Sequence, residues 1–325
     1  MVARDFALWL LPALLSIVAL FSGAAAQPAD PYPGHAAKFA GGVTGIPDVA
    51  YAMWSGYRPL LLDLYLPAAK DKSVPLVLFL HGGSMEGATS RYALGVEDLP
   101  AMLASLAARG YAVASINYRL SAEAQFPAQV QDVKAAIRFL RAHAAKYRID
   151  PARALVWGAS SGGLLAALAA ESCGQFAPPP SNSRPLLKEV AAANIPFSDC
   201  VQGAVIWYGP MDLSADGADP AIRAFLGCDP CDAAKLASAS PITFASSATP
   251  PMLLVNGAAD SAVPPSVPKA MAARLADFKV PVETYVIADV GHGFIGKTPE
   301  VTREANRKAL ERSFAFIDKV LSQVR

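Results

Sequence analysis

The stretch LVWGASSGG at Leu155–Gly163 decides the fold of this chain. Its apolar start predicts a buried strand, and its small residues after 162 favour a helix. Between them, GASSG at 158–162 follows the pattern G-x-S-x-G, which sets a serine on a sharp strand-to-helix turn. Ser160 therefore lies at a helix N-terminus, where aligned peptide dipoles favour negative charge. We predict that Ser160 is a nucleophile. Ser161 is the alternative, but its flanking positions hold Ala159 and Gly163.

Segments on both sides of this stretch alternate between strand-like and helix-like character. The run at Pro75–Leu80 has no polar alternation, as expected for a strand buried on both faces. The expected strands are Leu60–Leu66, Pro75–Leu80, Tyr111–Tyr118, Ala154–Trp157, Gln202–Tyr208, Met252–Asn256 and Val282–Ile287. The expected helices are Leu99–Arg109, Ala128–Tyr147, Gly163–Ala170, Val267–Phe278 and Phe314–Val324. This alternation predicts an α/β fold, with a mostly parallel sheet covered by helices on both sides.

The N-terminus has the three parts of a secretory signal peptide. An arginine precedes the apolar run Phe6–Phe21, and small residues ending at Ala26 form an A-x-A-like cleavage site. An uncleaved membrane anchor is the alternative, but the run falls short of roughly 20 residues and Pro12 interrupts it. We expect residues 1–26 to be removed, 27–47 to form a flexible leader and 48–325 to form one domain. The mature protein would then be secreted or periplasmic.

Composition and charge exclude some classes of partner. The chain has 325 residues, of which 53% are hydrophobic and 17% charged, enough for a sizeable core without a membrane-like composition. A net charge of +1 and the lack of a basic run argue against nucleic acid as a partner. No cysteine stands at the cleavage point to accept a lipid, so no stable membrane partner is expected either.

The four cysteines can form disulfides in an exported protein. Cys228 and Cys231 are close enough to close a small ring, which leaves Cys173 with Cys200 across an insertion. A redox C-x-x-C motif normally opens a helix after an early strand, and a four-cysteine zinc site normally shows a second C-x-x-C. Neither context is found here, so we expect two structural disulfides and no metal site.

A serine hydroxyl is a weak nucleophile that needs a base within hydrogen-bond reach. The chain has four histidines. His35 lies in the expected leader, His143 lies on the surface of a helix, and His81 precedes a Gly-Gly pair. The remaining one, His292, stands between glycines in a loop after the last expected strand. We therefore predict that His292 is the base.

The third catalytic group should be a carboxylate in a loop that follows a strand, between the serine and the histidine in the chain. Asp260 follows Met252–Asn256 in this way and would hold the His292 tautomer and stabilise the imidazolium. Asp212 also follows a strand, but an earlier one. Asp289 is too near His292 in sequence.

The tetrahedral intermediate of acyl transfer carries an oxyanion, which needs donors fixed in advance. The Ser161 backbone N–H, directly after the nucleophile, is one expected donor. Gly83 and Ser84 are the others, in the segment HGGS that follows the Pro75–Leu80 strand. Small residues let backbone N–H groups converge there. His81 would brace this loop.

One irregular region interrupts the alternation. Residues 171–200 include three consecutive prolines and few strand formers, and a long insertion of this kind is often a lid or part of a binding wall. Phe176, Ile195 and Phe197 are its candidate substrate contacts, as an apolar wall near the G-x-S-x-G turn at 158–162, the nucleophile elbow. The equal alternative is that they pack against the domain.

Taken with the elbow and HGG, three further motifs resemble one branch of the α/β-hydrolases. They are DLYLP at 63–67, NYRL at 117–120 and WYGPMD at 207–212. The branch is that of the bifunctional carbohydrate acetyl esterases and feruloyl esterases, near the hormone-sensitive-lipase-like esterases, and the resemblance covers about Val49–Phe316. It implies an α/β-hydrolase fold and a triad of Ser160, Asp260 and His292. That elbow usually reads G-x-S-A-G-G, and Ser161 in place of alanine keeps the N–H donor.

The resemblance also implies a carboxylesterase that acts on small or carbohydrate-linked esters, with acetyl or cinnamoyl acyl groups, and needs no cofactor. Two other functions share parts of this pattern. A serine exopeptidase of the prolyl-oligopeptidase type has the same triad order but usually a large additional N-terminal domain. A non-catalytic binding protein on the same fold typically loses a triad member, whereas all three are present in this sequence.

Overall fold

The computed structural model describes residues 35–54, 56–68, 72–176 and 197–323. The expected signal peptide, the first part of the expected leader and Ile195 lie outside these ranges.

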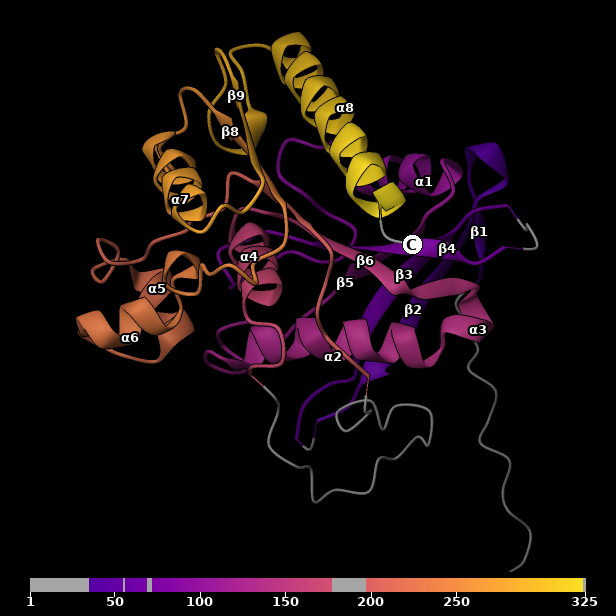
Figure 1. The fold of residues 1–325 in the computed structure, drawn as a ribbon, viewed down its shortest axis with the longest axis horizontal. Coiled ribbons are helices and arrows are strands. Elements are labelled where there is room, and N and C mark those ends of the chain that lie inside the picture. Colours follow the sequence, from indigo (N-terminus) through magenta and orange to yellow (C-terminus); the bar gives the residue numbers. More distant parts are fainter. Residues whose placement is uncertain (1–34, 55, 69–71, 177–196, 324–325) are drawn as a thin grey trace, which may run out of the picture. The chain divides into compact units, whose positions relative to one another are not determined.

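Nine strands of the described residues form one sheet in the order β1-β2-β3-β5-β4-β6-β7-β8-β9 (Figure 1). Strands β4 to β9 pair in parallel, whereas the β1–β2, β2–β3 and β3–β5 pairs are antiparallel. The strands are β1 Ala37–Lys38, β2 Thr44–Ala52, β3 Leu60–Leu66, β4 Val74–Leu80, β5 Ala112–Ile116, β6 Ile149–Ala159, β7 Ala204–Trp207, β8 Met252–Gly257 and β9 Val282–Ile287. The predicted α/β fold is confirmed.

Helices cover both faces of this sheet. They are α1 Leu99–Ala108, α2 Ala128–Ala142, α3 Ala144–Tyr147, α4 Ser161–Glu171, α5 Pro220–Leu226, α6 Ala233–Ser238, α7 Ser266–Asp277 and α8 Pro299–Gln323. Side chains of a strand point alternately to its two faces. On β4, Leu76 and Leu78 therefore join the core formed with α2, α4 and α7, and Val77 joins the core formed with α1 and α8. None of these helices is both long and apolar enough to span a bilayer.

The expected flexible leader at 27–47 was wrong in its second half. Residues 37–38 form β1, and β2 begins at Thr44 and pairs along β3. The register shifts between Ile46 and Val49, next to Gly45 and Pro47. Because glycine and proline are rare inside strands, the sequence pattern did not predict a strand there.

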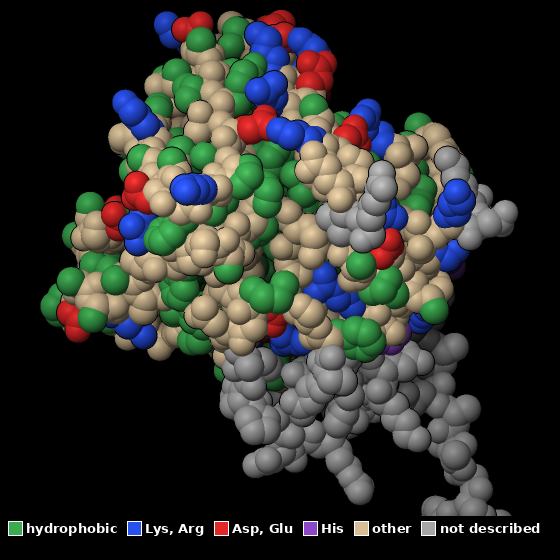
Figure 2. All heavy atoms as spheres, viewed as in Figure 1, with side chains coloured by type: hydrophobic (Ala, Val, Ile, Leu, Met, Phe, Trp, Pro, Cys, Tyr) green, Lys and Arg blue, Asp and Glu red, His purple; other side chains and the backbone are tan. Residues whose placement is uncertain are grey.

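Two helices also differ from their predicted bounds. The helix predicted at Ala128–Tyr147 ends at Ala142, and a short α3 follows after His143. The C-terminal helix begins at Pro299 instead of Phe314. Its first half carries positive and negative side chains along one exposed face (Figure 2), joined in ion pairs such as Arg303–Glu300 and Arg307–Glu304. Pairs at this spacing stabilise a helix that has few apolar residues.

Candidate active site

The serine of the elbow adopts a backbone conformation that residues other than glycine rarely take. Ser160, between β6 and α4, has φ 55° and ψ −124°, and its N–H donates to the Trp207 carbonyl at 2.9 Å. A Cβ at Gly162 would lie 2.2 Å from the Leu80 carbonyl oxygen, and one at Gly158 would lie 2.0 Å from the Gly162 oxygen. The two glycines thus allow α4 to begin directly against β4 and β6. Strain of this kind is concentrated at functional sites.

Three residues from three separate loops form one hydrogen-bonded chain. Ser160 Oγ lies 2.8 Å from His292 Nε2, and His292 Nδ1 lies 2.9 Å from Asp260 Oδ2. These residues follow β6, β9 and β8, whose carboxyl ends meet at one edge of the sheet. The Asp260 side chain is fully buried, and its Oδ1 accepts the N–H groups of Ala262 and Val263. The carboxylate is therefore fixed in orientation before any substrate arrives.

The alternative candidates lie elsewhere. Asp212 is exposed and accepts the Ser214 N–H, and Asp289 is exposed as well. His35 is exposed, and His143, half-buried at the end of α2, has its Nδ1 2.8 Å from the Phe139 carbonyl. The structure thus brings together the three residues that the sequence singled out.

His81 supports the loop that follows β4. Its Nδ1–H donates to the Gly82 carbonyl at 2.8 Å, and its ring stacks on Tyr118 at 4.4 Å. Tyr118 in turn donates its hydroxyl to the His81 carbonyl at 2.7 Å. Burial lowers the pKa of His81 to about 4, so the ring is neutral near pH 7. These contacts match the bracing role expected for it.

A pocket of about 180 Å³ opens beside Ser160. The loop after β4 contributes Gly83 and Ser84 to its wall, with φ of 104° and 55°. The complete lining is Gly82, Gly83, Ser84, Tyr92, Ala93, Leu94, Ala159, Ser160, Tyr208 and His292. The expected donor residues Gly83 and Ser84 thus face the same space as Ser160 and His292. The lining includes no lysine, arginine, aspartate or glutamate.

Four of the lining residues were missed by sequence reasoning: Tyr92, Ala93, Leu94 and Tyr208. The Tyr208 ring meets His292 edge-on, with the centroids 4.8 Å apart, and burial raises the pKa of its hydroxyl. Tyr208 belongs to the WYGPMD motif, which was the only available signal for it. Tyr92, Ala93 and Leu94 carry no motif, and only the fold brings them to the site.

The expected apolar wall from the insertion was wrong for its two described members. Phe176 packs its ring against Phe126 and Phe244, each with centroids 5.5 Å away. Phe197 is 44% exposed, and neither lines the pocket beside Ser160. The reason is that the 11 residues of α4 separate the elbow from the start of the insertion, and Phe176 packs there against the core that α2 and α4 share. For Phe176 the packing alternative holds.

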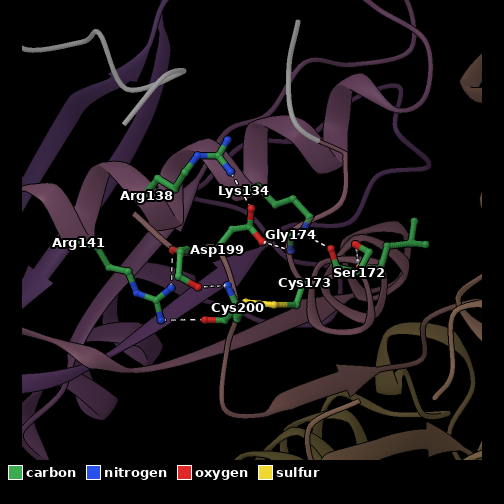
Figure 3. The surroundings of a disulfide bond; sticks show 10 residues. Lys134, Arg138, Arg141, Ser172, Cys173, Gly174, Asp199 and Cys200 are labelled. Atoms are coloured by element: carbon green, nitrogen blue, oxygen red, sulfur yellow. Dashed lines mark hydrogen bonds and ion pairs between the residues drawn. A yellow bond between two sulfur atoms is a disulfide. The ribbon is translucent and has the colours of Figure 1, made fainter. Parts of the chain in front are cut away.

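Both predicted disulfides are present, Cys173–Cys200 and Cys228–Cys231. The first joins the two ends of the insertion beside buried charges (Figure 3). There Asp199 accepts from Lys134 Nζ at 3.0 Å and from Arg138 at 2.8 Å. Cys173, Asp199 and Cys200 lie close enough to share a metal ion. Because both sulfurs are bonded to each other, however, they are not available as thiolate ligands.

The mostly parallel sheet, the elbow at its centre and the Ser–His–Asp chain at its carboxyl edge define the α/β-hydrolase fold. The BD-FAE family profile matches residues 62–275, and this chain belongs to that family.

Known relatives and structures agree with this assignment. The chain is 29% identical over 175 residues to carboxylesterase NlhH of Mycobacterium tuberculosis, covering 50% of this chain and 53% of that protein. It is similar in structure to a truncated carbohydrate esterase from gut microbiota, with a TM-score of 0.70 and 27% identity over 86% of this chain and 97% of that one. A bifunctional GH43-CE protein of Bacteroides eggerthii has a TM-score of 0.69 and 30% identity, over 85% and 35% of the two chains. The match spans about half the length of the curated relatives.

Proposed function

We propose that this protein is a secreted serine carboxylesterase that hydrolyses acetyl or feruloyl-type esters, including esters of carbohydrates, through an acyl-enzyme. The observation that carries the proposal is the chain of two hydrogen bonds from Ser160 Oγ through His292 to the buried Asp260. The same constellation performs acyl transfer on unrelated folds, because its roles depend on geometry alone.

The proposed reaction uses only protein groups and water. His292 Nε2 takes the proton of Ser160 as Oγ bonds to the ester carbonyl carbon, and the carbonyl oxygen becomes an oxyanion. Collapse of this intermediate breaks the bond to the alcohol, which leaves with the proton from His292. His292 then takes a proton from water as the water oxygen bonds to the acyl carbon. Collapse of this second intermediate breaks the bond to Ser160 Oγ, which receives the proton from His292, and the acid is released.

Backbone donors would stabilise the two oxyanions. As the first residue of α4, Ser161 has an N–H without a partner inside the helix. The N–H groups of Gly83 and Ser84 would complete the oxyanion hole, since both residues line the pocket. In serine hydrolases one such donor contributes about 3 kcal/mol to the transition state.

The pocket and the relatives support the substrate class. A lining without lysine, arginine, aspartate or glutamate fits a neutral acyl group, and the Tyr92 ring offers a surface for an aromatic one. Two of the similar structures are described as a carbohydrate esterase and a bifunctional GH43-CE protein. Export is supported by the signal-peptide pattern at 1–26 and by two disulfides, which persist outside the cytosol.

The proposal is tested with the purified mature protein, 4-nitrophenyl acetate and methyl ferulate, beside a Ser160→Ala variant. We expect turnover of at least one ester, reduced by about 10⁴-fold or more in the variant. Mass spectrometry of the secreted protein should place its first residue near Gln27. Turnover that survives in the variant would contradict the role of Ser160. No turnover of either ester would contradict the small-ester assignment and direct the search to peptide substrates.

A further inference from the structure

Three sequence motifs outside the triad converge on one segment, residues 89–95. Asp63 of DLYLP and Asn117 of NYRL bind its first residues, and Tyr208 of WYGPMD reaches its last ones. Tyr92 and Leu94, in its middle, line the pocket beside Ser160. The proposed reaction uses none of the three motif residues.

The buried carboxylate of Asp63, on β3, holds the start of the segment. Its Oδ2 accepts Ser90 Oγ at 3.0 Å and Arg91 Nε at 2.8 Å. Its Oδ1 accepts Arg91 Nη2 at 2.7 Å and the Asp48 N–H at 3.1 Å. One carboxylate therefore orients the side chains of Ser90 and Arg91, the two residues directly before Tyr92. These contacts hold the segment firmly, because hydrogen bonds to ionised groups are stronger than those between neutral groups.

Ser90 is bound through its backbone as well. Its N–H donates to Asn117 Oδ1 at 2.8 Å, and its carbonyl accepts the Ser115 hydroxyl at 2.6 Å. Asn117 Nδ2 also donates to Ser90 Oγ at 3.2 Å. Because Asp63 lies in β3, Ser115 in β5 and Asn117 directly after β5, the position of Ser90 is set by the central sheet.

The other end of the segment is held against the histidine loop. Asn306 of α8 donates to the Gly95 carbonyl at 3.0 Å, and the Tyr208 hydroxyl donates to the Leu94 carbonyl at 3.4 Å. A Cβ at Gly95 would lie 2.0 Å from the Gly293 oxygen, so the two loops touch directly. Residues 92–94 thus lie between two segments that are fixed by hydrogen bonds or close backbone contact, at Ser90 and at Gly95.

The side chains between these points are unusually open for their size. Tyr92 is 53% exposed and Leu94 is 39% exposed, although both are large and apolar. Exposed apolar side chains grouped at the mouth of a pocket mark a binding surface.

We propose that residues 89–95 form a fixed selectivity wall that contacts the larger acyl groups of the substrate, and that Asp63 is a positioning residue that sets this wall through Ser90 and Arg91. The inference rests on the proposed esterase function. A planar aromatic acyl group lies against Tyr92, whereas an acetyl group ends before it reaches the wall. Loss of the Asp63 charge therefore shifts the preference between acyl groups more than it affects turnover of acetyl esters.

The test compares 4-nitrophenyl ferulate with 4-nitrophenyl acetate, which share a leaving group and differ only in the acyl group. We expect Asp63→Asn and Tyr92→Ala each to lower the ferulate-to-acetate ratio of kcat/KM by about five- to tenfold, the size of one aromatic contact. In Asp63→Asn, which changes no residue of the pocket lining, the kcat for the acetate should stay within about twofold of the wild-type value. An unchanged ratio in Asp63→Asn would overturn the inference. A wild-type enzyme that hydrolyses the acetate but not the ferulate would overturn it as well.

Asp199→Asn is the matched control. Asp199, like Asp63, is a buried carboxylate in ion pairs, here with Lys134 and Arg138, but it holds the base of the insertion (Figure 3). We expect this variant to lose thermal stability and keep the ratio. If it shifts the ratio as far as Asp63→Asn does, the effect is one of general stability and the inference fails.

A double-mutant cycle separates the wall from other routes. If Asp63 acts through the wall, its substitution adds little to the ratio once Tyr92 is already alanine, and fully additive effects would overturn the inference. Should Asp63→Asn fail to fold, Ser115→Ala removes one hydrogen bond to Ser90 and is expected to shift the ratio in the same direction. Absence of Ser160-dependent turnover overturns the proposed function itself, whereas such turnover with unchanged ratios overturns only the wall.

Discussion

At the scale of single residues, the buried Asp260 decides how His292 is presented to Ser160. Its Oδ2 accepts from His292 Nδ1, which leaves Nε2 free of its proton and directed at the serine hydroxyl. The other oxygen is held by two backbone N–H groups of the same turn. The turn thus prepares a hydrogen-bond acceptor on one side only, where the imidazole lies.

Asp260→Asn should keep the fold and lose activity. Asparagine Oδ1 can still accept the N–H groups of Ala262 and Val263, but its amide presents a donor to His292 and favours the wrong tautomer. We expect kcat to fall by about 10⁴-fold with a nearly unchanged melting temperature, measured with 4-nitrophenyl acetate and by calorimetry. The control is Asp212→Asn, which should remain close to wild type. If the two variants behaved in the opposite way, the carboxylate of the triad would be Asp212.

At the scale of elements, α4 is buried along its whole length, between the elbow and the insertion. It begins where Gly162 touches the backbone of β4 and ends at Glu171. Both carboxylate oxygens of Glu171 are buried without a hydrogen-bond partner among the described residues. Burial raises the pKa of this group well above its ordinary value of 4.5.

The raised pKa of Glu171 makes the stability of the domain depend on pH. The folded state keeps the proton where the unfolded chain releases it, so this group stabilises the fold fully below pH 4.5. The contribution is lost as the pH rises from there through the folded-state pKa.

Glu171→Gln should therefore melt a few degrees higher than wild type at pH 8, with a difference that narrows toward pH 4.5. Calorimetry across this range checks the prediction. Glu304→Gln serves as the control, because a hydrogen bond to Arg307 lowers the pKa of the exposed Glu304 to about 2. That variant should not gain stability at any pH. A constant difference between Glu171→Gln and wild type would show that the carboxyl is not responsible.

At the scale of the whole molecule, covalent and ionic bonds close the base of the insertion together. The Cys173–Cys200 disulfide joins residues 27 positions apart, and Arg141 donates to the carbonyls of Ser198 and Cys200. Lys134 and Arg138 hold Asp199 between them. The insertion is thus tied to α2 at its base.

Replacing Cys173 and Cys200 by serine should lower the free energy of unfolding by about 3.5 kcal/mol in the chain-entropy model. We expect kcat to be preserved, because Cys173 follows the end of α4, about 16 Å along the helix from Ser160. Denaturant unfolding and ester turnover measure the two effects separately. The Cys228–Cys231 disulfide closes a much shorter loop, so the same change there should lower the free energy of unfolding by less. Loss of kcat in the first variant alone would instead connect the insertion to the site.

Local sequence was sufficient for the buried strands and for the triad. The strand at β4 and the elbow at 158–162 each depend on residues within a few positions of one another, and the order of strands brings their carboxyl ends to one edge. Ser160, His292 and Asp260 could be predicted because each stands in a loop directly after such a strand. β2 escaped because Gly45 and Pro47 interrupt its pattern, and its place depends on pairing with β3.

The fold class, the nucleophile with its two partners and both disulfides could be predicted without coordinates, since each follows from a short-range pattern or from a small set of residues. Their surroundings became known from the three-dimensional structure alone. In the structure, Phe176 packs against Phe126 and does not form the expected wall, whereas Tyr92 and Leu94 line the pocket. A pocket wall cannot be predicted from local sequence, because it forms from loops whose positions depend on contacts distant in sequence, such as Asp63 with Ser90 and Asn306 with Gly95.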